Sequence, residues 1–155
     1  MNQRSPIIGV IGSGQSENSI YQLAVEVGEE IAKRGAILVC GGLTGVMEAA
    51  AEGASSAGGL TVGILPGPST NSANSFIKIP VATDMGQARN VIIAHTADAL
   101  VAVAGGAGTL SEIGHALKAG KPVVGLQTIP DIPGVQYVDS AQKALARAFE
   151  LIHIT

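Results

Sequence analysis

Three glycine-rich segments of the sequence have the composition of phosphate-binding turns. Each follows a short apolar run, and together they contain Gly12, Ser13, Gly14, Gly41, Gly42, Gly105, Gly106, Gly108 and Thr109. Because the carboxyl ends of parallel strands meet at one edge of a sheet, we expect these turns to lie close together. Glycine lets backbone N–H groups at helix N-termini approach an anion. Turns also use glycine for its positive φ alone, but its recurrence at three turns favours a phosphate site.

Two charged side chains near these turns are candidates for chemistry. Glu112 lies on the predicted helix after the third turn, and we expect it to face the ligand edge, opposite a buried face of Leu110, Ile113, Gly114 and Leu117. Thr109-x-x-Glu112 is also the capping-box pattern, in which the glutamate only stabilises the helix start. Arg89 begins another helix, and arginine suits bidentate recognition of phosphate or carboxylate. Its alternative role is a surface ion pair with Asp84.

Several other kinds of site do not fit the motifs. The first turn lacks the third glycine of G-x-G-x-x-G, and Cys40-Gly41 stands where a dinucleotide site needs Asp or Glu. No G-K-[ST] sequence is present to form a Walker A loop. Cys40 is the single cysteine and is expected in the core, while His95, His115 and His153 have no metal-ligand spacing. We therefore expect a smaller phosphate-bearing ligand, with neither a metal nor a cofactor.

The composition argues against nucleic-acid and membrane partners. The chain has 155 residues, of which 46% are hydrophobic and 14% charged, with a net charge of −3. No basic stripe is present to neutralise nucleic-acid phosphates, and no apolar run reaches the roughly 18–20 residues that span a bilayer. No secretory signal is recognisable, so we expect a cytoplasmic protein. Because charged residues fall well below the average of about 25%, we also expect a homodimer or a higher homo-oligomer.

Strand and helix patterns alternate along the chain. The predicted strands are 7–11, 37–40, 61–65, 76–82, 99–103 and 122–126, and the predicted helices are 19–34, 44–57, 86–96, 109–119 and 139–152. Such short, continuously apolar strands predict one doubly wound α/β domain over residues 1–155, with about six mostly parallel strands and helices on both faces. Pro80 favours an edge position for its strand. The Ala-rich stretch 48–57 suits close helix packing, on the sheet or across a dimer.

These motifs resemble those of the Lonely Guy family. Residues 105–112, GGAGTLSE, are similar to its P-G-G-x-G-T-x-x-E signature, and residues 41–47, GGLTGVM, to its loop G-G-G-x-x-G-L-M. The resemblance implies a Rossmann-like fold and hydrolysis of the N-glycosidic bond of a nucleoside 5′-monophosphate, giving base and ribose 5-phosphate. It implies that Arg89 and Glu112 form the catalytic pair and that Gly105, Gly106, Gly108 and Thr109 bind the phosphate. It implies no lysine decarboxylase chemistry.

Two departures from the family motifs point to a divergent branch. Ala104 replaces the proline of the signature, and the family's M-H-x-R-K segment is here MGQARN, residues 85–90, without its His and Lys. This variant is similar to the branch that includes molybdenum cofactor carrier proteins, which bind a phosphate-bearing pterin without hydrolysing it. The sequence therefore leaves two functions open, a phosphoribohydrolase and a non-catalytic carrier of a pterin phosphate or nucleotide.

Overall fold

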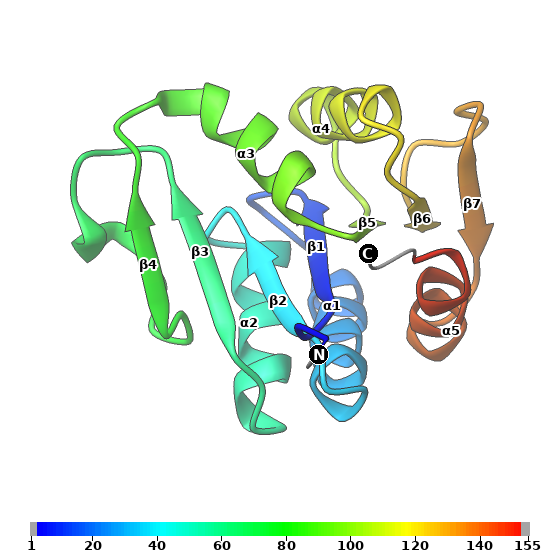
Figure 1. The fold of residues 1–155 in the computed structure, drawn as a ribbon, viewed down its shortest axis with the longest axis horizontal. Coiled ribbons are helices and arrows are strands. Elements are labelled where there is room, and N and C mark those ends of the chain that lie inside the picture. Colours follow the sequence, from blue (N-terminus) through cyan, green and yellow to red (C-terminus); the bar gives the residue numbers. More distant parts are fainter. Residues whose placement is uncertain (1–2, 153–155) are drawn as a thin grey trace.

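The computed structural model describes residues 3–152, which form a parallel sheet covered by helices (Figure 1). The strands are β1 (Ile7–Gly12), β2 (Ile37–Cys40), β3 (Thr61–Leu65), β4 (Ile79–Ala82), β5 (Ala99–Val103), β6 (Val123–Leu126) and β7 (Val135–Val138). The helices are α1 (Asn18–Lys33), α2 (Val46–Ser56), α3 (Arg89–Thr96), α4 (Ala107–Lys118) and α5 (Ala141–Leu151), with 3-10 turns η1 (Thr70–Ser72) and η2 (Gly86–Ala88). No helix in this part of the chain is long and apolar enough to cross a membrane.

The strand order is β4-β3-β2-β1-β5-β6-β7, and each pair is parallel. The chain first builds the sheet outward from β1 to β4, and then returns to β5 on the other side of β1. This reversal places the topological switch point between β1 and β5. In open α/β sheets, ligands bind at the carboxyl ends of the strands at this point. The doubly wound α/β fold predicted from the sequence is confirmed.

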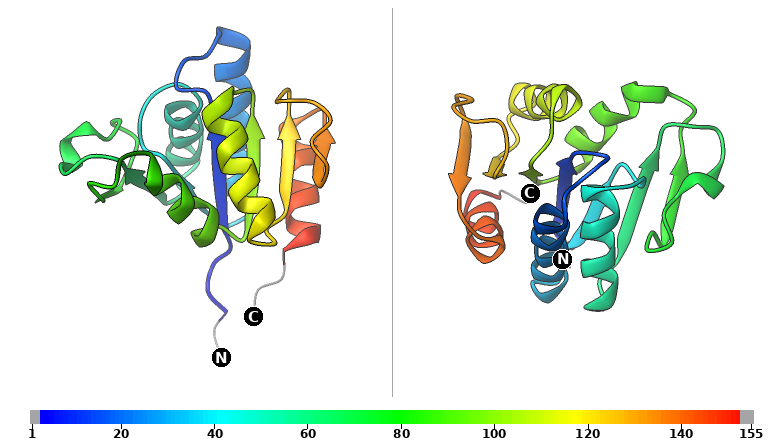
Figure 2. Two further views of the ribbon diagram at one scale, coloured as in Figure 1. Left: turned by 90° about the horizontal axis from the view of Figure 1, so that it is seen from above. Right: turned by 180° about the vertical axis from the view of Figure 1, so that it is seen from behind.

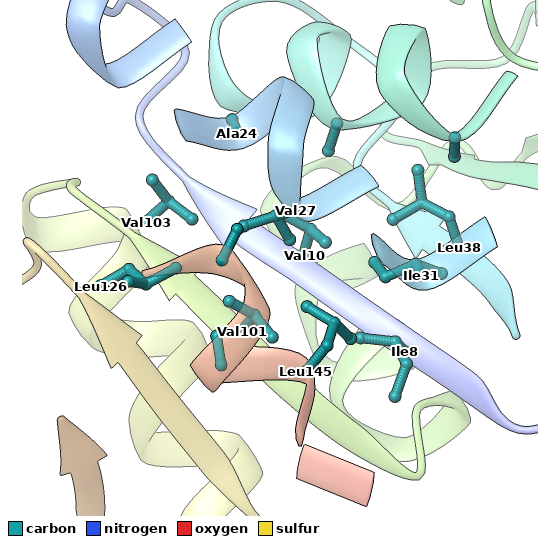
Figure 3. Close-up of a cluster of buried hydrophobic side chains, with 14 of the residues drawn as sticks. Ile8, Val10, Ala24, Val27, Ile31, Leu38, Val101, Val103, Leu126 and Leu145 are labelled. Carbon is teal, nitrogen blue, oxygen red and sulfur yellow. The ribbon is translucent and has the colours of Figure 1, made fainter. Parts of the chain in front are cut away.

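Helices α3 and α4 lie on one face of the sheet and α1, α2 and α5 on the other (Figure 2, right), and an apolar cluster packs each group onto its face. One cluster joins β1, β2, β5 and β6 to α1, α2 and α5, and includes Val27, Leu38 and Leu145 (Figure 3). The other joins the opposite face to α3 and α4 through Ile93 and Ile113. The sheet is therefore buried on both sides, which explains strands without polar alternation.

Helices α1 and α2 pack almost backbone to backbone. A Cβ atom added at Gly28 would lie 2.0 Å from the carbonyl oxygen of Ala50, and one at Gly53 would lie 1.9 Å from that of Val25. Ala50 and Ala54 are fully buried in this contact region. The small residues of α2 thus serve packing within the chain, which accounts for the Ala-rich stretch without a dimer.

Three local expectations need correction. The sheet has a seventh strand, β7, which follows a loop rich in proline and lies at the sheet edge, where Tyr137 is exposed. Strand β4 begins at Ile79, later than predicted, although its position at the other edge agrees with Pro80. Helix α4 begins at Ala107, two residues earlier than predicted.

The buried face of α4 also differs from the prediction. It is formed by Thr109, Ile113 and Ala116, whereas Leu110 is 46% exposed and Gly114 is exposed. The buried face therefore follows the i, i+4, i+7 spacing of Thr109, Ile113 and Ala116, so that the hydroxyl-bearing Thr109 packs inward. Cys40 is buried, as expected, and His153 lies outside the described residues.

Candidate functional site

A cavity of about 310 Å³ opens at the carboxyl end of β1, next to the switch point. Its walls come from the turns that follow β1, β2 and β5, from η2 and the start of α3, and from the first turns of α4. The predicted site residues that line it are Gly12, Ser13, Gly14, Gly41, Arg89, Gly106, Gly108, Thr109 and Glu112. Gly42 and Gly105 belong to the same turns but are not part of the lining.

The start of α4 leaves its backbone N–H groups available to a ligand. Gly106 is the N-cap, no side chain caps the helix, and the first turn holds no acidic residue. The first N–H groups of a helix have no partner within it and carry the positive end of its dipole, so they favour an anion. A Cβ atom at Gly106 or Gly108 would meet nothing within 4 Å. These two glycines therefore keep open a space in which a phosphate could reach the amides.

The backbone just before this turn is bent in a way that excludes proline. Ala104 has a φ of 51° and Gly105 a φ of 103°. The N–H of Ala104 donates to the carbonyl oxygen of Leu126 at 3.2 Å. Proline has a φ near −65° and no N–H, so Ala104 cannot be the proline of the Lonely Guy signature in this conformation. A Cβ at Gly105 would also lie 2.2 Å from the hydroxyl of Thr109. This close approach explains why residue 105 is a glycine although it does not line the cavity.

Arg89 is a buried residue of the cavity wall, and not a surface partner of Asp84. Its side chain is 5% exposed, and its Nε donates to the carbonyl oxygen of Ile64 at 2.8 Å. Its Nη1 donates to Oδ1 of Asn90, and its Nη2 lies 3.5 Å from the carbonyl oxygen of Gly41. Burial lowers the pKa of the guanidinium, which stays protonated. Arg89 therefore supplies one fixed positive charge to the cavity.

Glu112 faces the same cavity with a shifted pKa. Burial raises the pKa of its carboxyl group to about 7, and the positive charge of Arg89 opposes this rise. Among residues 3–152, the carboxyl group of Glu112 takes part in no ion pair. Because Gly106 is the N-cap of α4, Thr109 is the third helical residue and the capping-box interpretation is wrong. At neutral pH, Glu112 is thus available both as an acid and as a base.

The sequence motifs missed several residues of the cavity wall. Gln87 and Asn90 line the cavity beside Arg89, and Leu43 and Met47 supply its apolar surface. Gln87 and Asn90 lie in the segment that departs from the family motif, so this departure was the available signal. Across the described residues, no cluster of three potential metal ligands exists.

Residues 5–151 match the sequence profile of the SLOG cluster4 family. The chain belongs to the SLOG cluster4 family. A protein of uncharacterised function from Archaeoglobus fulgidus is 51% identical over 138 residues, which cover 89% of this chain and 91% of that protein. The family profile, which spans residues 5–151, therefore covers the sheet, the helices on both faces and the cavity.

Two solved structures resemble this fold along nearly its whole length. The molybdenum cofactor carrier protein of Chlamydomonas reinhardtii is 41% identical with a TM-score of 0.89, over 96% of this chain and 98% of that one. The molybdenum cofactor binding protein of Rippkaea orientalis is 35% identical with a TM-score of 0.90, over the same shares. These likenesses confirm the resemblance to the carrier branch.

A cytokinin riboside 5′-monophosphate phosphoribohydrolase of Mycobacterium tuberculosis shows a more partial similarity. It is 36% identical over 114 residues, which cover 68% of this chain and 61% of the enzyme. The chain thus spans less than two thirds of the length of this relative. The expected kinship with the Lonely Guy enzymes is confirmed, while it is more distant than the kinship with the carriers.

Proposed function

We propose that the cavity binds a phosphorylated nitrogen heterocycle, and that the protein carries a pterin phosphate of the molybdenum cofactor type without cleaving it. The observation that carries this proposal is the uncapped start of α4, which opens into the cavity at the switch point of the sheet. In this role, Gly106, Gly108 and Thr109 hold the phosphate through backbone N–H groups. The likeness to the two carrier structures along 96% of the chain supports the pterin ligand.

The charges of the cavity suit an anionic ligand that is bound and released. Arg89 is held by carbonyl oxygens of the scaffold, so its charge is fixed in place before the ligand arrives. Glu112 is partly protonated near neutral pH, which limits its repulsion of a phosphate. The site therefore offers preorganised donors with little opposing charge, which favours binding.

A second candidate is hydrolysis of a nucleoside 5′-monophosphate. The observation that favours it is that Arg89, from α3, and Glu112, from α4, both line the cavity. Cleavage of an N-glycosidic bond builds positive oxocarbenium character on the ribose. The ionised form of Glu112 would stabilise that charge or activate water, and Arg89 would orient the phosphate or the leaving base. The departure at Ala104 and the absence of the motif's His and Lys weigh against this activity.

One experiment separates these functions. The purified protein is mixed with AMP and with IMP, binding is measured by calorimetry, and free base is sought by chromatography. Binding without release of base supports the carrier, and catalytic release supports the hydrolase. Binding of neither nucleotide would overturn the hydrolase candidate, and the carrier is then tested with a pterin phosphate in place of the nucleotides.

A matched pair of variants tests the phosphate position. Gly106→Val should abolish binding while the fold persists, because the added side chain would fill the space beside the α4 amides. Gly67→Val is the control, since Gly67 also has open space around its Cβ position but does not line the cavity. If the Gly106→Val protein and the wild type bound the nucleotide with equal affinity, the phosphate would not bind at the start of α4.

The remaining expectations complete this proposal. We propose that the protein acts in the cytoplasm and assembles as a homodimer or higher homo-oligomer. Exposed apolar side chains support the assembly, since Met85 is 51% exposed and Leu110 is 46% exposed.

A further inference from the structure

Three polar side chains in the cavity wall form a hydrogen-bonded series. Nη1 of Arg89 donates to Oδ1 of Asn90, and Nδ2 of Asn90 donates to Oε1 of Gln87 at 3.3 Å. Asn90 is 6% exposed, whereas Gln87 is exposed at the mouth of the cavity. The series therefore runs from the buried guanidinium outward to the place where a ligand would enter.

The guanidinium fixes the direction of every amide in this series. Arginine has donors and no acceptor, so Asn90 must turn its oxygen toward Arg89. The amide nitrogen of Asn90 then points to Gln87 and requires the oxygen of that side chain. Among residues 3–152, the Nε2 group of Gln87 meets no acceptor. Gln87 thus has two N–H donors free for a ligand at the cavity that it lines, while its oxygen already accepts a hydrogen bond from Asn90.

We propose that Gln87 is a specificity-determining residue that selects a heterocycle bearing an oxo group over one bearing an amino group. An oxo oxygen accepts an N–H of Gln87, whereas an exocyclic amino group, itself a donor, has to compete with Asn90 for the oxygen of Gln87. This inference rests on the proposed function, because it assumes a heterocyclic monophosphate in the cavity. It goes further by naming the substituent that the protein recognises.

The placement of Gln87 assigns it to the heterocycle and not to the phosphate. The phosphate has its own donors in the uncapped start of α4, where Gly106 and Gly108 leave space. Gln87 belongs to η2, before α3, and comes from a different wall. A neutral amide also suits a neutral carbonyl oxygen, whereas a phosphate is matched by charge and by a helix dipole.

The test compares the dissociation constants of IMP, a 6-oxopurine nucleotide, and AMP, its 6-amino counterpart. These ligands share ribose and phosphate, so the ratio of their constants isolates the heterocycle. The wild type should bind IMP about tenfold more tightly than AMP, in keeping with the discrimination supplied by a good hydrogen-bonded base contact. Gln87→Met, which keeps the length but has no N–H, should bring the ratio close to one.

A charged variant should reverse the preference. Gln87→Glu presents an acceptor in place of donors, so AMP should then bind more tightly than IMP, although both bind less tightly than to the wild type. Gln142→Glu makes the same charge change on α5, outside the cavity lining, and should leave the ratio unchanged.

Two results would overturn the inference and leave the proposed function intact. One is equal binding of IMP and AMP by a wild type that still depends on Gly106, and the other is an oxo preference that survives in Gln87→Met. Failure of the wild type to bind either nucleotide would overturn the inference as well, whereas failure to bind a pterin phosphate would overturn the proposed function.

Discussion

The helix pairs on the two faces of the sheet differ in what their small residues do. Between α1 and α2, Gly28 and Gly53 let the helix backbones meet, and added Cβ atoms would lie about 2 Å from carbonyl oxygens. On α4, Gly108 and Gly114 have nothing within 4 Å of the same position. Gly28 and Gly53 thus allow close packing between two helices, whereas Gly108 adjoins the cavity and Gly114 lies on the surface.

Charge follows the same division. Among the described residues, the one buried charged side chain is Arg89, which lies with Asn90 on α3 at 5% and 6% exposure. Burying such groups costs free energy unless they are hydrogen-bonded, and both are. One face of the sheet thus provides stability, and the other gives up part of it to hold a site.

The largest expected effect on stability is at the contact between α1 and α2. Gly53→Ala should lower the free energy of unfolding by about 3 kcal/mol or more, because its methyl group overlaps the carbonyl oxygen of Val25 and forces the helices apart. Chemical denaturation monitored by circular dichroism measures the change. A loss below about 1 kcal/mol would mean that the α1–α2 contact yields easily, and the contrast between the faces would weaken.

Much of this division could be predicted from sequence, because it depends on local patterns. The apolar runs give the strands that are buried on both sides, and the glycines after them give the edge where the cavity lies. Strand β7 was missed because its four residues follow Pro133-Gly134 and carry an exposed Tyr137, so they look like a loop.

The electrostatics of the site could not be predicted in this way. The burial of Arg89 and the raised pKa of Glu112 depend on distant carbonyls and on the closing of α3 and α4 around the cavity. The capping interpretation failed for a related reason. It assumed that α4 starts at Thr109, whereas the positive φ of Ala104 and Gly105 lets the chain turn earlier.

The next prediction concerns the free energy of unfolding that is lost by burying the carboxyl group of Glu112 on α4. Because burial raises the pKa of Glu112 from 4.5 to about 7, the folded state holds its proton more tightly than the unfolded state. Stability is therefore lost as pH rises from about 4.5 to 7, and the full cost is present above pH 7. Glu112→Gln removes this cost and should stabilise the protein at pH 8 by up to about 3 kcal/mol.

The pH dependence is the critical measurement for Glu112. Thermal unfolding of the variant and the wild type should differ at pH 8 and converge at about pH 3.5, where Glu112 is protonated in both the folded and the unfolded state. A difference that is the same at both pH values would show that the carboxyl group is not destabilised by burial. If Glu112→Gln were less stable than the wild type at pH 8, burial of the ionised Glu112 would not cost stability, and the prediction would be wrong.

The smallest expected effect on stability comes from Gly114, an exposed glycine of α4. Gly114 lies inside α4, has ordinary helical φ and meets no atom within 4 Å of its Cβ position. Gly114→Ala should therefore raise the free energy of unfolding by about 0.5–1 kcal/mol, since alanine loses less backbone entropy in a helix. The same substitution has opposite signs at Gly53 and Gly114 if the two helix pairs differ as described. Denaturant midpoints of the two variants measure this directly, and a loss of stability at Gly114 would indicate that another surface packs against α4 there.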